Sequence, residues 1–83
     1  MTHPRSEALD WSAMSLEEIL ALAIEDEEDA QDYYRRAAEQ ASTVHTRRLL
    51  LDLSEMERGH ADTLRKELEE LQSQRELEAG MAD

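Results

Sequence analysis

Apolar residues recur at steps of three and four along two long stretches of this chain, separated by one short break. This spacing places them on one face of a helix and is typical of heptad-like packing. The apolar positions are Leu20, Ala23, Ile24, Ala30, Ala37, Ala38 and Ala41 in the first stretch, and Leu50, Leu53, Ala61, Leu64, Leu68 and Leu71 in the second. Residues 42–46 between them carry β-branched and hydroxyl side chains suited to a turn. The pattern predicts an all-α fold, an antiparallel two-helix hairpin.

The ends of this hairpin can be placed from local signals. Ser15-Leu16-Glu17-Glu18 has the pattern of a capping box, in which Ser15 caps the helix and Glu18 reaches back. Residues 1–14 lack sustained periodicity and predict an N-terminal arm that is flexible or docks through Leu9 and Trp11. The second helix is expected to fade after about Leu77. We therefore predict an arm at 1–14, a hairpin at 15–77 and a tail at 78–83.

Length and charge limit the partners. A hairpin of 83 residues leaves a long apolar face in water unless another chain covers it, so at least a homodimer is expected. No internal repeat would let one chain form a full four-helix bundle. The net charge of -12 argues against nucleic acid and anionic membranes as partners. With no spanning segment and no signal peptide, we expect a cytoplasmic protein.

Three ionisable residues interrupt the apolar stripes: Glu27 in the first, and Glu57 and His60 in the second. Glu57 and His60 are three apart, so both can hold one ion, and in an antiparallel hairpin Glu27 lies at their level. An unpartnered carboxylate in such a position would cost several kcal/mol. Two carboxylates and an imidazole are half of the ligand set of a carboxylate-bridged di-metal bundle. The chain has no Cys, so thiolate sites are excluded. We predict metal ligation by these residues, completed by a second copy.

Plainer interpretations exist for each of these residues. A heptad stripe tolerates polar residues that fix its register, and a small phase error would turn Glu27 to water. Tyr34, two turns from Glu27, either hydrogen-bonds a ligand carboxylate or is an ordinary core tyrosine. Asp26 and Asp29 either guide cations inward or belong to a solvated acidic face. Gly59 costs helix stability and could permit close approach of a backbone beside His60.

The segment Glu27-Glu28-Asp29-Ala30-Gln31-Asp32-Tyr33-Tyr34, followed by Glu57-Arg58-Gly59-His60-Ala61, resembles the encapsulated ferritins, two-helix members of the ferritin-like superfamily. It is also similar to half of a rubrerythrin-type bundle and to the ferritin-like domain of membrane-bound ferritins. The resemblance covers about residues 15–72. Gly59 departs from it, because relatives often carry an acidic residue there.

The resemblance implies a ferroxidase that oxidises Fe(II) with oxygen for iron storage or detoxification. The resemblance also implies that Glu27, Glu57 and His60 are the ligands of two Fe ions shared by a pair of chains. Tyr34 stands beside that site, and Asp26 and Asp29 match iron-entry residues. It further implies a decameric ring of dimers, carried as cargo inside an encapsulin shell. Residues 78–83 show no clear shell-targeting peptide.

Two alternatives stay open. One is a rubrerythrin-like enzyme that scavenges peroxide, although without Cys the chain has no rubredoxin-type centre to supply electrons. The other is a non-catalytic helical oligomerisation module. The ligand types would also accept Mn or Zn.

Overall fold

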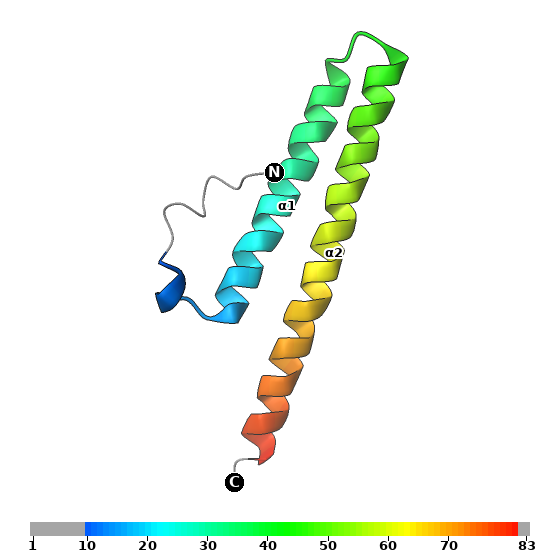
Figure 1. Ribbon diagram of the computed structural model, residues 1–83. Coiled ribbons are helices and arrows are strands. Elements are labelled where there is room, and N and C mark those ends of the chain that lie inside the picture. Colours follow the sequence, from blue (N-terminus) through cyan, green and yellow to red (C-terminus); the bar gives the residue numbers. More distant parts are fainter. Residues whose placement is uncertain (1–9, 82–83) are drawn as a thin grey trace.

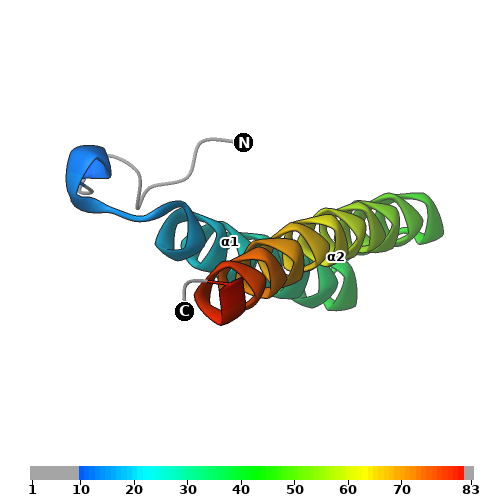
Figure 2. The same cartoon turned by 90° about the horizontal axis from the view of Figure 1, so that it is seen from below.

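A computed structural model describes residues 10–81 of the chain. They form a short 3-10 helix, η2 (Trp11–Ala13), and two long α-helices, α1 (Leu16–Glu39) and α2 (Val44–Met81). The two α-helices run antiparallel and lie side by side (Figure 1), and the same arrangement is visible when the molecule is seen from below (Figure 2). The predicted two-helix hairpin is therefore confirmed.

The start of α1 is the capping box expected from the sequence. The Ser15 hydroxyl oxygen accepts a hydrogen bond from the Glu18 backbone N–H at 3.1 Å, and Glu18 Oε1 accepts one from the Ser15 backbone N–H at 3.3 Å. Ahead of it, Asp10 caps η2 by accepting a hydrogen bond from the Ser12 N–H at 3.2 Å. Trp11 is 48% exposed, and Leu9 lies outside the described residues. The predicted docking of the arm through Leu9 thus lies outside them too.

The turn between the helices is shorter than predicted. Helix α2 begins at Val44, so Val44, His45 and Thr46 belong to its first turn and the assignment of 42–46 to the turn was wrong. The cause is Thr43: its hydroxyl oxygen accepts a hydrogen bond from the Thr46 N–H at 3.1 Å, and its carbonyl accepts one from the Arg47 N–H at 3.1 Å. A hydroxyl residue in this position caps the helix and lets it start at once.

The end of α2 is later than predicted. The helix passes the expected end near Leu77 and includes Gly80. Among the described glycines none has a positive φ, so Gly80 keeps a helical backbone and does not act as a C-cap. As a result α2 is longer than α1, and its last turns extend past the start of α1 (Figure 1).

The interface between α1 and α2 has a small buried core, built mostly from small side chains. Its buried apolar residues are Ile24, Ala30, Ala38 and Ala61. Arginine–glutamate ion pairs link the helices, Arg65 to Glu28 at 3.3 Å and Arg75 to Glu17 at 2.6 Å. Side chains this small allow two helices to approach closely, which brings functional groups of both within reach of each other.

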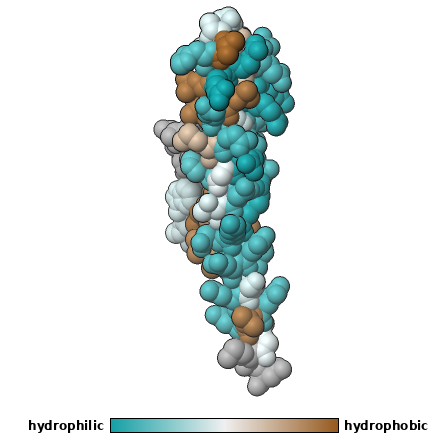
Figure 3. All heavy atoms as spheres, turned by 90° about the vertical axis from the view of Figure 1, so that its right-hand side faces the viewer, coloured by the Kyte–Doolittle hydropathy of each residue, from teal (hydrophilic) through white to brown (hydrophobic). Residues whose placement is uncertain are grey.

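Much of the apolar surface stays outside this interface. Leu49, Leu51 and Met56 on α2 are exposed, and Figure 3 shows brown apolar surface near the turn end of the hairpin among hydrophilic groups. None of the helices within residues 10–81 is both long and apolar enough to cross a membrane.

Candidate metal centre

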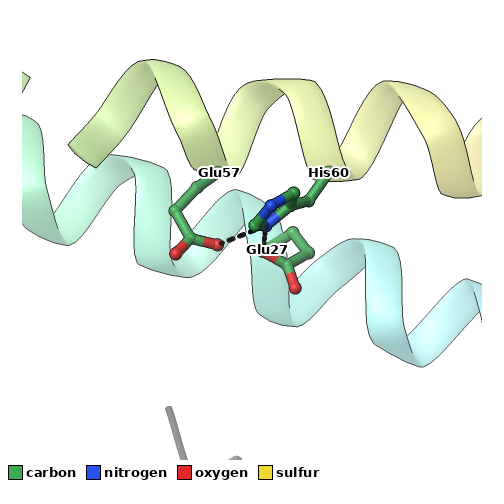
Figure 4. Close-up of side chains that lie close together, drawn as sticks. All are labelled: Glu27, Glu57 and His60. Atoms are coloured by element: carbon green, nitrogen blue, oxygen red, sulfur yellow. Dashed lines mark ion pairs between the residues drawn. The ribbon is translucent and has the colours of Figure 1, made fainter. Parts of the chain in front are cut away.

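The structure brings the three predicted ligands together. Glu27 projects from α1, and Glu57 and His60 project from successive turns of α2 toward it (Figure 4). One ligand atom from each residue lies within 4.8 Å of the others. The level at which the two helices pair therefore agrees with the level expected from an antiparallel hairpin.

The spacing of the donor atoms fits a bound ion. His60 Nδ1 lies 3.6 Å from Glu27 Oε2 and 3.6 Å from Glu57 Oε2. These separations are longer than a good hydrogen bond. Oxygen and nitrogen donors that hold one small divalent ion at ~2.1 Å each lie up to about 4.2 Å apart, so the separations of His60 from the two carboxylates are compatible with one ion between them. Carboxylate and imidazole donors suit iron, and also Mn and Zn.

The cluster has a closed side and an open side. The side chains of Glu27 and Glu57 are only 14% and 16% exposed, and Glu27 Oε2 is buried. His60, in contrast, is 59% exposed. The expectation that all three side chains sit in a dry stripe therefore holds for the two carboxylates but not for His60 in a single chain. The cause is the helical phase, because position 60 lies at the edge of the α2 face that meets α1.

The positively charged side chains nearest the cluster in the sequence, Arg58 and Arg65, form ion pairs along the outer side of α2. Arg58 donates two hydrogen bonds to Glu55, at 3.0 and 2.8 Å, and lies 3.7 Å from Asp62. The hydrogen bond and the charge of Glu55, and then the charge of Asp62, raise the pKa of the Arg58 guanidinium above its usual value. Arg65 pairs with Asp62 at 2.9 Å as well as with Glu28. Both guanidinium groups thus have carboxylate partners outside the cluster.

The other predicted site residues lie on α1 near Glu27. Tyr34 is half-buried, and its ring meets the ring of Tyr33 edge-on, with centroids 5.5 Å apart. Asp26 is half-buried and Asp29 is exposed. Their roles beside the site and in iron entry stay predictions.

One contact at the level of the cluster was missed by the sequence reasoning. The Ser54 hydroxyl donates a hydrogen bond to the backbone carbonyl of Gln31 at 3.0 Å, from α2 to α1. Ser54 stands one turn before Glu57 in the sequence. A lone serine among leucines nevertheless gave no hint that its partner would be a carbonyl of the other helix.

Comparison with protein families identifies the chain. The rubrerythrin family model matches residues 18–82, which is most of the chain and includes all three clustered residues. The chain belongs to the rubrerythrin family. Comparisons with curated proteins and with solved structures gave no match. Membership in the rubrerythrin family implies iron and di-iron redox chemistry, and so supports the broader part of the resemblance. The narrower likeness to encapsulated ferritins stays a prediction.

Proposed function

We propose that this rubrerythrin-family chain is a ferroxidase, which oxidises Fe(II) to Fe(III) with oxygen at a di-iron site formed between two copies. The observation that carries the proposal is the convergence of Glu27, Glu57 and His60 within 4.8 Å. Burying two carboxylates costs free energy, and metal binding explains why both lie mostly buried beside an imidazole.

A second copy is needed to complete the site. Three side chains are too few for two irons, whereas two copies supply four carboxylates and two imidazoles, the set found in di-metal carboxylate bundles. The exposure of His60 supports this, because the open side of the cluster is where another chain could add its ligands. In this proposal neither the complete site nor the oxidation exists in a monomer.

The chain's own groups suit the reaction. Fe(II) is the substrate, each ion loses one electron, and oxygen accepts the electrons together with protons from solvent. Glu27 and Glu57 provide negative charge that favours the ferric product, in a position with little access to water. His60 would bind an ion through a ring nitrogen. Asp26 and Asp29 would draw cations toward the cluster, and Tyr34 would stand beside it.

The larger assembly follows from the resemblance to encapsulated ferritins. We propose a ring of paired chains, a decamer, that acts as iron-oxidising cargo inside an encapsulin shell. An open ring has no cavity in which to store mineral, so storage would need such a shell.

A second candidate is the scavenging of peroxide, which the match to the rubrerythrin family favours. The same cluster would then use hydrogen peroxide as the electron acceptor. A non-catalytic oligomerisation module is the third interpretation, in which the polar residues only fix the register of the helices.

The test is rapid mixing of the anaerobic protein and Fe(II) with oxygen, followed by near-ultraviolet absorbance. We expect fast growth of ferric absorbance in the unaltered protein, and its loss in Glu57→Ala and His60→Ala. His45→Ala is the matched control, since His45 is an exposed histidine on the same helix. Normal oxidation in the two ligand variants would overturn the proposal. Replacing oxygen with hydrogen peroxide separates the first two candidates, since a peroxide scavenger oxidises Fe(II) faster with peroxide. A protein that binds no metal, before or after these substitutions, would favour the oligomerisation module.

A further inference from the structure

The interface beside the metal cluster gives the two helices little steric register. Ala30 on α1 and Ala61 on α2 are both buried, and Ala61 is 0% exposed. The methyl groups of these two alanines present no deep ridges, so at this level they allow neighbouring registers with similar packing. A shift by one turn would move Glu27 by ~5.4 Å relative to Glu57 and His60, which exceeds the spread of the whole cluster.

Ser54 supplies a directional contact at this level. Ser54 is the only buried polar residue among the described residues, and it is 7% exposed. A serine inside a helix usually bonds a carbonyl of its own preceding turn or points to water. Ser54 instead donates across the interface to the carbonyl of Gln31, at 3.0 Å.

The two ends of this hydrogen bond lie next to the ligands. Gln31 is one turn after Glu27 on α1, and Ser54 is one turn before Glu57 on α2. A carbonyl that already accepts a helical hydrogen bond has a second lone pair available. The Ser54 bond therefore ties α1 to α2 within one turn of the Glu27 and Glu57 side chains.

We propose that Ser54 is a positioning residue for the metal centre: its hydrogen bond to Gln31 sets the level of α1 at which Glu27 faces Glu57 and His60. This inference rests on the proposed metal-binding function. A ligand cluster tolerates displacements of only about 0.5 Å before its geometry suffers, so a contact that fixes the level of the helices affects affinity without touching the ion.

The test compares Ser54→Ala with Thr63→Ala, using Co(II) as an oxygen-insensitive probe. Thr63 donates the same kind of bond, at 3.1 Å to the Gly59 carbonyl, also within one turn of a ligand, but within α2 alone. We expect Ser54→Ala to weaken Co(II) binding about tenfold and to change its visible ligand-field spectrum, while Thr63→Ala leaves both unchanged. Alanine favours the helix more than serine does, so folded α2 is expected in the variant.

A second measurement needs no metal. The 13C resonance of the Gln31 carbonyl should shift in Ser54→Ala and not in Thr63→Ala. Co(II) affinity and spectrum unchanged in Ser54→Ala would overturn the inference, whatever happens to its stability, as would an unmoved Gln31 resonance. Failure of the proposed function looks different, because the unaltered protein itself would then bind neither Co(II) nor Fe(II).

Discussion

The two sides of the cluster formed by Glu27, Glu57 and His60 are built differently. The inner side, where α1 meets α2, consists of Ile24, Ala30, Ser54 and Ala61, all buried. The open side consists of Leu49, Met56 and His60, all exposed and spaced by seven and four residues on one face of α2. The inner side is complete in a single chain. The open side presents an apolar stripe with one imidazole in it.

This difference separates what one chain can do from what needs a partner. The inner side holds Glu27 and Glu57 at one level and shields them from water. The open side leaves His60 exposed to water, with the carboxylates of Glu27 and Glu57 on its inner side. In the proposed function, substitutions on the inner side act on the hairpin, whereas substitutions on the open side act on the association of chains.

The largest effect is expected from substituting Glu27, the α1 carboxylate of the cluster. Glu27→Gln keeps the size of the side chain but removes its charge and one donor oxygen. We expect Fe(II) oxidation by oxygen to fall roughly 100-fold or more, since changes beyond the direct ligands already cost ten- to a hundredfold in metal affinity. Stopped-flow absorbance measures this. Glu25→Gln, an exposed glutamate two residues away, should leave the rate unchanged, and equal losses in both variants would contradict a specific ligand role for Glu27.

The level of the cluster is the part of the site that the sequence could predict. Helical periodicity and the antiparallel hairpin were sufficient to place Glu27 beside Glu57. The difference in exposure between Glu57 and His60 was not predictable, because it depends on which edge of α2 faces α1. The Ser54 bond was also beyond reach, since its acceptor is a backbone carbonyl and backbone groups leave no trace in a sequence.

The ends of the helices also divide into those that the sequence could predict and those that it could not. The capping box at Ser15 has a local signature and was found. The start of α2 was misplaced because Thr43, Thr46 and their neighbours suit a turn and a cap equally well, and only the hydrogen bonds of Thr43 decide between them.

The second prediction concerns the packing of the inner side. Ile24 is 8% exposed and lies one turn before Glu27 on α1. Ile24→Ala should lower the free energy of unfolding by about 2 kcal/mol, the lower end for such truncations, because the buried core between the helices is small. Urea unfolding followed by circular dichroism measures it. Leu16→Ala, at a 57% exposed position of the same helix, should cost far less, and an equal cost would mean that the inner side is not the stabilising core.

The third prediction addresses the open side. Met56→Glu places a charge in the exposed stripe beside His60 and should weaken association of chains about tenfold, because a charge buried in an apolar contact is poorly solvated. Sedimentation across a range of concentrations measures this, and Fe(II) oxidation should fall in parallel. Leu77→Glu is the control, as Leu77 is equally apolar and 67% exposed but lies far along α2 from the cluster. Association that weakens only in Leu77→Glu would move the pairing surface away from His60.

The smallest effect is expected at Gly59, next to His60 in sequence. A Cβ built on Gly59 meets nothing within 4 Å, so within one chain this glycine is not needed for close approach of a backbone. Gly59→Ala should therefore stabilise α2 by roughly 0.5–1 kcal/mol and leave Fe(II) oxidation unchanged. Thermal unfolding at several protein concentrations tests the first statement, and stopped-flow absorbance tests the second. A variant that is more stable but associates more weakly would show that a second copy approaches α2 at Gly59, so the pairing surface would extend from the open side around the helix. The same gain in thermal stability at every protein concentration would confine that surface to the Leu49, Met56 and His60 stripe.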